Sequence, residues 1–222
     1  MINDLEDYIE EHISPEPELL REIDRQTNLR FINGRMCSGH IQGRLLKMLV
    51  AMTAPLRVLE LGTFTGYSAL CIAEALGPGA SLDTIEIDDE LQDFILENFS
   101  RSPHGNKIRL HIGDALQIMD IWPEEEFDLI FIDADKRQYA RYFQESLRLL
   151  KSGGFLIADN TLWDGHVVET TKHATQTEGI IEFNDLVAGA KDCEVAIIPI
   201  RDGITIIRKL PNQTESPDSL LS

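Results

Sequence analysis

The chain has 222 residues, enough for one domain with a sizeable core. It carries 20 Lys and Arg against 38 Asp and Glu, and the net charge of −18 makes nucleic acids and anionic membranes poor candidate partners. With no long apolar run and an acidic start, Met1–Ile13, the sequence indicates a cytoplasmic protein without a membrane span or a secretory signal.

The N-terminal part predicts helices. Apolar residues recur at helical spacing over Ile2–Phe31, where a Ser14-Pro15 break marks the start of a new helix. A further helix is expected at Gln42–Met52, ending before a proline. We therefore assign residues 1–54 to N-terminal helices.

From Arg57 onward, short apolar runs alternate with longer amphipathic stretches. Runs that are apolar almost throughout are typical of strands buried on both faces, and their alternation with helices indicates a parallel sheet covered on two sides. The predicted strands are Val58–Leu61, Leu82–Ile87, Ile108–Ile112, Leu129–Ile132 and Phe155–Ala158. The predicted helices are Ser68–Leu76, Asp88–Phe99, Ala115–Ile121 and Gln138–Leu150.

The C-terminal part breaks this alternation. Two β-rich runs, Cys193–Ile200 and Ile204–Lys209, are separated only by Arg201, Asp202 and Gly203, which permits an antiparallel hairpin but no crossover helix. We therefore predict an α/β fold with a Rossmann-like, doubly wound sheet of seven strands, mostly parallel, with an antiparallel strand in the C-terminal hairpin. One domain is expected over residues 1–210, with its α/β core at 55–210 and a disordered tail at 211–222.

The first predicted strand runs into a glycine-rich loop that begins at Gly62. In open α/β sheets, ligands bind beyond the carboxyl ends of the strands, which is where this loop should lie. Glu86 ends the next strand, 24 residues after Gly62, and a carboxylate there can accept hydrogen bonds from both ribose hydroxyls of a nucleotide. Asp114, after the third strand, could accept from an adenine amino group or could cap the following helix.

The sequence of this loop argues against a dinucleotide. It reads G-T-F-T-G-Y-S and lacks the G-x-G-x-x-G pattern of nicotinamide-dependent enzymes. Glu60 stands two residues before Gly62, and its carboxylate suits a cationic ligand group or a backbone amide better than a pyrophosphate. The pattern therefore favours S-adenosylmethionine, which carries an ammonium and a sulfonium, over NAD.

Oxygen-bearing side chains follow the fourth and fifth predicted strands. Asp133 and Asp135 come after one strand, followed by Lys136, and Asp159 and Asn160 come after the other. Carboxylates gathered at one edge of a sheet repel each other, and oxygen ligands select a hard cation, Mg²⁺ before Mn²⁺ or Ca²⁺. The alternative is that these acids only cap the loops after their strands.

These segments together resemble the cation-dependent, class I S-adenosylmethionine O-methyltransferases, the family of the catechol and caffeoyl-CoA O-methyltransferases, on its bacterial branch. The resemblance extends from about Met36 to Lys209. Its motifs are Glu60–Ser68, Ile132–Lys136, Asp159-Asn160 with Trp163 and Gly165 beyond, and Asp202-Gly203.

The resemblance implies roles for individual residues. Asp133, Asp159 and Asn160 match the metal ligands of the family, Lys136 matches its general base, and Trp163 matches a residue that shapes the substrate pocket. The positions that contact S-adenosylmethionine are Glu60, Gly62, Ser68, Glu86 and Ala115, with Asp133 near the amino-acid end of that molecule.

The expected function is methyl transfer from S-adenosylmethionine to a hydroxyl of a small, catechol-like substrate chelated to a divalent metal. Lys136 would accept the hydroxyl proton, although a salt bridge to Asp133 or Asp135 is an alternative role. The resemblance also implies a homodimer supported by the N-terminal helices. A nicotinamide-dependent oxidoreductase and a non-catalytic binding protein of the same fold are the competing interpretations, and the role of His166 stays open.

Overall fold

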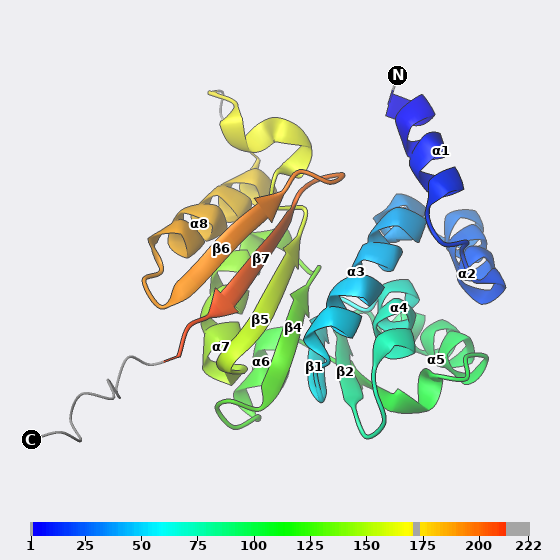
Figure 1. Cartoon of the computed structure of the whole chain (residues 1–222), viewed down its shortest axis with the longest axis horizontal. Helices are drawn as coiled ribbons and strands as arrows, with labels where there is room; N and C mark the ends of the chain where they lie inside the picture. The colour runs from blue at the N-terminus through cyan, green and yellow to red at the C-terminus, as the bar shows by residue number, and fades with distance from the viewer. Residues whose placement is uncertain (1, 171–173, 212–222) are drawn as a thin grey trace, which may run out of the picture. The chain divides into compact units, whose positions relative to one another are not determined.

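The computed structural model describes residues 2–170 and 174–211, and the predicted tail lies almost wholly outside them (Figure 1). The chain divides into two units, Met1–Ile118 and Met119–Ser222. None of the helices in the described residues is long and apolar enough to cross a membrane.

Helices open the first unit, as the sequence predicts. They are α1 (Ile2–His12), α2 (Glu18–Arg30), the short 3₁₀ turn η1 (Gly34–Met36) and α3 (Gly39–Thr53). The break between α1 and α2 falls at the predicted Ser14-Pro15 step. After α3 the backbone turns through Ala54, whose φ of 46° lies in the left-handed region, so the helix ends at Thr53, two residues before Pro55.

A parallel βα arrangement completes the first unit. Its elements are β1 (Arg57–Leu61), α4 (Tyr67–Ala75), β2 (Ser81–Glu86), η2 (Asp89–Leu91), α5 (Gln92–Ser100), η3 (Gly105–Lys107), β3 (Ile108–Ile112) and α6 (Ala115–Asp120), which continues into the second unit. The predicted helix 88–99 begins as the 3₁₀ turn η2, because Asp88 accepts a hydrogen bond from the Glu90 N–H at 3.0 Å. In β1, Val58–Leu61 are fully buried, which matches the continuous apolar run.

The second unit holds the remaining strands. Its elements are β4 (Phe127–Ile132), η4 (Lys136–Gln138), α7 (Tyr139–Leu149), β5 (Leu150–Asp159), η5 (Trp163–Val168), α8 (Thr175–Gly189), β6 (Cys193–Ile198) and β7 (Ile204–Lys209). Strand β5 begins five residues before the predicted Phe155, because its first half contains Lys151, Ser152 and two glycines and shows no apolar pattern. Helix α8 was not predicted.

The strands follow the order β3-β2-β1-β4-β5-β7-β6, and this confirms the predicted seven-stranded α/β fold. Strand β7 pairs antiparallel with both β5 and β6, so the C-terminal hairpin reverses one strand, as expected. The hairpin does not simply extend the sheet, because β7 inserts between β5 and β6 and leaves β6 at the edge.

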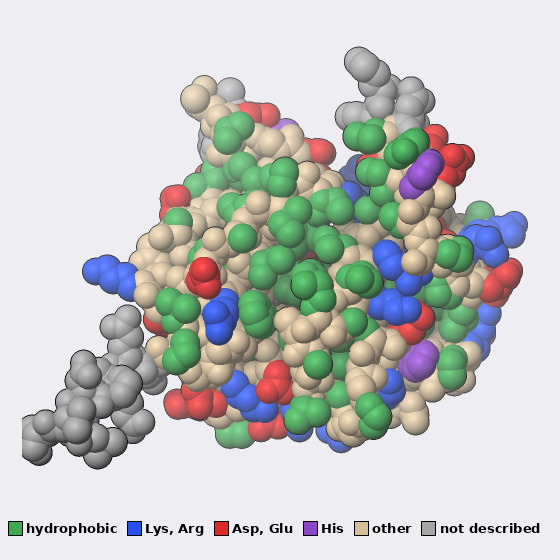
Figure 2. Space-filling view, in the orientation of Figure 1, with side chains coloured by type: hydrophobic (Ala, Val, Ile, Leu, Met, Phe, Trp, Pro, Cys, Tyr) green, Lys and Arg blue, Asp and Glu red, His purple; other side chains and the backbone are tan. Residues whose placement is uncertain are grey.

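Helices α7 and α8 pack on one face of the strands of the second unit (Figure 1). Their contact is aromatic: the Phe183 ring of α8 meets the rings of Tyr139 and Phe143 edge to face at 5.4 and 5.9 Å. On the opposite face Phe155 and Ile206 are half-buried, and Figure 2 shows apolar side chains over β5 and β7 there. The helices of the second unit thus shield one face of its strands.

Candidate active site

The loop of residues 62–66 turns sharply after β1. Gly62, Phe64 and Gly66 have φ values of 96°, 49° and 86°, in the region that favours glycine. The N–H groups of Gly62 and Thr63 donate to the carbonyl of Ile85 in β2, at 3.0 and 3.2 Å. A Cβ at Gly66 would lie 2.6 Å from the Phe99 ring, so this position accepts only glycine without a shift.

A buried carboxylate lies beneath this loop. Glu60 has no exposed surface, and its Oε2 accepts from the Thr84 hydroxyl at 2.6 Å. The Thr63 hydroxyl lies 2.6 Å from that of Thr84. Because a hydroxyl has a single hydrogen and Thr84 gives its own to Glu60, Thr63 donates to Thr84. These hydrogen bonds connect the loop to β1 and β2.

Glu86 connects two loops at the end of β2. It is only 8% exposed, and its oxygens accept from the N–H of Phe64 at 2.7 Å and of Asp88 at 2.9 Å. Burial raises the pKa of Glu86, while the Asp88 and Phe64 N–H groups act in the opposite direction. Glu86 is thus a mostly buried carboxyl group that joins the loop after β1 to the loop after β2.

The other residues predicted to bind S-adenosylmethionine, the methyl donor, lie on α4 and α6 or just before them. Ser68, in the first turn of α4, is 6% exposed, and Ala115, at the start of α6, is 9% exposed. Asp114 accepts from the Gln117 N–H at 3.1 Å, which is the helix-capping arrangement. The first unit thus brings Glu60, Gly62, Ser68, Glu86, Asp114 and Ala115 to the carboxyl ends of three strands and the helices that follow them.

In the second unit, two of the predicted metal ligands, Asp133 and Asp159, each come directly after one residue of a pair that is in register between β4 and β5. Ile132 of β4 is in register with Ala158 of β5, so Asp133 and Asp159 end neighbouring parallel strands. Asp159 is 3% exposed and its Oδ1 accepts from the N–H of Asn160 at 2.8 Å.

Lys136 is buried against the same strand ends. Its Nζ donates to Asp133 Oδ1 at 2.7 Å and to the Tyr139 hydroxyl at 2.8 Å. The Tyr139 hydroxyl lies 3.0 Å from the backbone carbonyl of Asp159, and full burial raises the pKa of this phenol well above its ordinary value. The salt bridge to Asp133 that was one alternative is therefore present. Tyr139 was missed, although its place one helical turn after Lys136 could have indicated it.

The β6–β7 turn supports the loop that carries Asn160. The N–H groups of Leu162 and Trp163 donate to the Asp202 carbonyl at 2.7 and 3.1 Å, and Asn160 Nδ2 lies 3.4 Å from Asp202 Oδ2. Burial, followed by the nearby Asp164 carboxylate, raises the pKa of Asp202. Trp163 is half-buried in this loop with a φ of 47°. Thus Asn160 and Trp163 are held by a turn about 40 residues later in the chain.

These residues fit a hard cation. Within residues 2–170 and 174–211, no three His, Cys, Asp or Glu side chains converge on a point where a metal could bind. A cation bound here would need Asn160 as a third oxygen ligand beside Asp133 and Asp159. The Asn160 amide nitrogen faces Asp202, which directs the amide oxygen elsewhere, and two carboxylates with one carboxamide are the donors that Mg²⁺ prefers.

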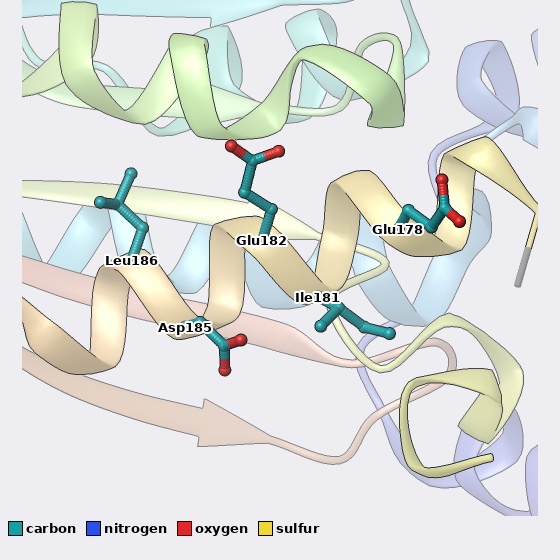
Figure 3. Close-up of a pocket in the computed structure, with 5 residues that line it drawn as sticks. All are labelled: Glu178, Ile181, Glu182, Asp185 and Leu186. Carbon is teal, nitrogen blue, oxygen red and sulfur yellow. The ribbon is translucent and has the colours of Figure 1, made fainter. Parts of the chain in front are cut away.

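A separate shallow hollow lies on α8. Figure 3 shows its five lining side chains, Glu178, Ile181, Glu182, Asp185 and Leu186, all on this one helix. Three of the five are acidic, and none is a predicted site residue. His166 is exposed and its Nδ1 lies 2.7 Å from Glu169 Oε1, a surface pair.

The comparisons with known proteins agree with this arrangement. The O-methyltransferase family profile matches residues 10–210, and the chain therefore belongs to that family. Tricin synthase 2 of Oryza sativa is 33% identical over 88% of this chain and 70% of its own, and the caffeoyl-CoA O-methyltransferase of Petroselinum crispum is 30% identical over 88% and 85%. The O-methyltransferase TomG of Streptomyces achromogenes, solved with S-adenosylmethionine, superposes with a TM-score of 0.87 at 27% identity, over 93% of this chain and 96% of TomG.

Family membership confirms the resemblance read from the sequence and makes the chain an O-methyltransferase of the caffeoyl-CoA O-methyltransferase type. It also places the chain outside the nicotinamide-dependent oxidoreductases.

Proposed function

We propose that this protein transfers the methyl group of S-adenosylmethionine to a hydroxyl oxygen of a small, catechol-like acceptor held with a divalent cation. The observation that carries the proposal is the placement of Asp133 and Asp159 at paired strand ends, with Lys136 buried against Asp133. Mg²⁺ is the cation that the donor set favours, with Mn²⁺ or Ca²⁺ as alternatives. The bound S-adenosylmethionine of TomG supports the choice of donor.

The first unit is assigned the methyl donor. Glu86 accepts from the ribose hydroxyls, and Glu60 and Gly62 shape the loop near the amino-acid part. Ser68 and Ala115 contribute contacts from the first turns of their helices. Asp114 either accepts from the adenine amino group or acts only through its helix cap, and the cap is supported by the bond to the Gln117 N–H at 3.1 Å.

The second unit is assigned the acceptor. Asp133, Asp159 and Asn160 hold the cation, which when bound supplies a positive charge that favours the ionised form of an acceptor hydroxyl. Asp133 is also assigned a place near the amino-acid end of the donor. Trp163 forms a wall of the acceptor pocket.

Lys136 is assigned as the base that accepts the proton of the acceptor hydroxyl. The acceptor oxygen forms a bond to the methyl carbon as the bond from that carbon to sulfur breaks, and the electron pair stays on sulfur. The hydroxyl proton passes to the amine form of Lys136, whose Nζ is oriented by Asp133 and Tyr139. The remaining task is alignment, because in-line transfer needs the two reacting atoms to be held together.

The test is a methyl-transfer screen over catechols and caffeoyl-type compounds, with and without Mg²⁺. We expect transfer that excess chelator abolishes, and an Asp159→Ala variant that is folded but inactive. Asp128→Ala removes a carboxylate from an ion pair on β4 and is the matched control. Full activity of Asp159→Ala, or unchanged activity in excess chelator, would remove the metal from the mechanism.

We also propose that the protein is a homodimer supported by its N-terminal helices. Exposed apolar residues on α1 and α3 favour this: Leu5, Tyr8 and Met52 are 62%, 58% and 76% exposed. Light scattering should give about twice the mass of one chain, and a purely monomeric protein would refute the proposal.

A further inference from the structure

Thr65, in the loop assigned to the methyl donor, is held from one side by the N-terminal helix α2. Thr27 of α2 has no exposed surface, and its hydroxyl lies 2.8 Å from the Ile23 carbonyl and 2.9 Å from the Thr65 hydroxyl. A hydroxyl has one hydrogen but two acceptor positions. The single hydrogen of the Thr27 hydroxyl is therefore shared between the Ile23 carbonyl and the Thr65 hydroxyl, which both accept from it.

Helix α5 holds Thr65 from another direction. The side chain of Asn98 is also buried, with 1% of the residue exposed, and its Nδ2 donates to the Thr65 carbonyl at 3.0 Å. Thr65 itself is 1% exposed, so this carbonyl depends on a protein donor. The two helices thus bind the hydroxyl and the carbonyl of the same loop residue.

Several other hydrogen bonds of the loop run to β2 and its end, and the Gly66 N–H donates to the Thr63 carbonyl at 2.9 Å within the loop. Gly62 and Thr63 donate to the Ile85 carbonyl, and Phe64 donates to Glu86. Thr65 lies in the half of the loop that leads to α4, where the contacts described come from helices. This half is therefore positioned by tertiary packing and not by the strand ladder.

Further contacts join α2 to the same region. The Phe31 ring, directly after α2, meets the rings of Phe64 in the loop at 5.9 Å and Phe94 of α5 at 5.5 Å. Arg30 lies over the Phe94 ring at 5.2 Å. Helices α2 and α5 therefore form a frame in which polar bonds and aromatic packing act on the same loop.

We propose that Thr27 and Asn98 are positioning residues for the methyl donor, acting through Thr65 to keep the loop of residues 62–66 in its binding conformation. The inference rests on the proposed function, because it assigns this loop to S-adenosylmethionine. A loop held in place before the ligand arrives loses less conformational freedom on binding. Loss of either bond leaves a buried polar group of Thr65 without its partner and allows the loop to leave that conformation.

The experiment measures by calorimetry the Kd of S-adenosylhomocysteine, which is what remains of S-adenosylmethionine after methyl transfer. It also measures kcat, the KM of each substrate and the Tm. Thr27→Val keeps the shape of the side chain but removes the hydroxyl, and Asn98→Ala removes the amide. Each should raise the Kd of S-adenosylhomocysteine and the KM of S-adenosylmethionine about fivefold. The KM of the acceptor should change by less than about twofold, because acceptor binding is assigned to other residues.

The controls separate positioning from stability. Thr53→Val is matched to Thr27→Val, since the Thr53 hydroxyl makes the same helical bond, to the Leu49 carbonyl at 2.9 Å, but does not touch the loop. Because Thr53 is only half-buried, this variant should lower the Tm less than Thr27→Val does, and it should leave the Kd unchanged. Thr27→Ser keeps the hydroxyl and should restore the wild-type Kd. Thr65→Val should weaken binding in the wild-type background and add little to Thr27→Val.

The outcomes distinguish this inference from the proposed function. If the wild-type protein binds no S-adenosylhomocysteine, the proposed function fails. If the wild type binds and both Thr27→Val and Asn98→Ala bind within about twofold of it, only the positioning role is overturned, whatever their Tm values. Should Thr27→Val not fold, Asn98→Ala and Thr65→Val decide the question by the same criterion.

Discussion

The carboxyl group of Glu86 is buried at the end of β2, and its burial raises its pKa. A protonated carboxyl loses acceptor capacity, whereas the ribose hydroxyls assigned to it are donors. Donor binding therefore favours the carboxylate and releases a proton when Glu86 is protonated. We predict that affinity for S-adenosylhomocysteine rises as the pH increases through the titration of Glu86, above the ordinary carboxyl range, and calorimetry in buffers of different ionisation enthalpy can measure this.

Glu86→Gln should bind more weakly and lose that pH dependence. The pH dependence of the stability runs in the opposite direction to that of the affinity. A raised pKa means that the folded protein binds this proton more tightly than the unfolded chain does. The contribution of Glu86 to the free energy of unfolding therefore falls as the pH rises from its ordinary pKa to its raised one. Glu90→Gln, on the exposed surface of η2, is the control. An unchanged pH profile in Glu86→Gln would contradict the assignment.

Lys136 has a different environment, since its hydrogen-bond partners Asp133 and Tyr139 both lie in the second unit, to which acceptor binding is assigned. Lys136→Met keeps most of the apolar stem and removes the amine. We predict that kcat falls about 100-fold or more, the range of general acid–base catalysis, with the KM of S-adenosylmethionine nearly unchanged. Steady-state kinetics decide this.

Lys151→Met, which breaks a surface ion pair with Asp128, is the matched lysine control and should remain active. If Lys136→Met mainly weakens donor binding, the assignment of Lys136 as the base is wrong.

At the scale of elements, α8 fixes the position of η4. Gly179 of α8 faces the backbone of η4, and a Cβ there would lie 2.4 Å from the Lys136 carbonyl oxygen and 2.8 Å from the Arg137 Cα. Gly179→Ala must push η4 and α8 apart. We predict a loss of about 1–3 kcal/mol in the free energy of unfolding, together with a lower kcat because Lys136 moves.

Gly189 offers the matched control in the same helix, because a Cβ there meets nothing within 4 Å. Gly189→Ala should leave the free energy of unfolding unchanged or raise it by about 0.5 kcal/mol through the unfolded state. Urea unfolding of both variants measures the difference. Equal stabilities would show that the contact between α8 and η4 can relax at no cost.

The same helix shows what sequence patterns can miss. Ile180, Phe183 and Val187 are buried and recur at helical spacing, so a periodic signal was present. Gly179 inside α8 weakened this periodic signal, because glycine is typical of turns. In the structure Gly179 allows close packing against η4 and makes no turn. The position of β7 between β5 and β6 could not be predicted from the sequence, because the spacing of a hairpin is the same whichever of its strands lies at the edge of the sheet.

At the scale of the whole molecule, the net charge of −18 opposes folding by self-repulsion. We predict that the Tm rises with NaCl up to a few hundred millimolar, as the Debye length falls below about 10 Å. Mg²⁺ at matched ionic strength should raise the Tm further, since specific binding to the folded state adds stability.

Differential scanning fluorimetry tests both effects. Asp159→Ala should keep the response to NaCl and lose the additional response to Mg²⁺. Asp128→Ala, which removes the same charge elsewhere, should keep both. An equal Mg²⁺ response in all three proteins would mean that the cation acts only through general screening.

The sequence alone determined the class of fold, the approximate strands and the residue types at their ends, because burial and hydrogen bonding impose short, local periods on the chain. It thereby predicted the residues assigned to the donor and to the cation, and the assignment to the family was confirmed. Only the tertiary structure decided which partners these residues have. Thr65 is bonded by Asn98 across 33 positions and by Thr27 across 38 positions, because packing brings together groups whose sequence separation leaves no pattern.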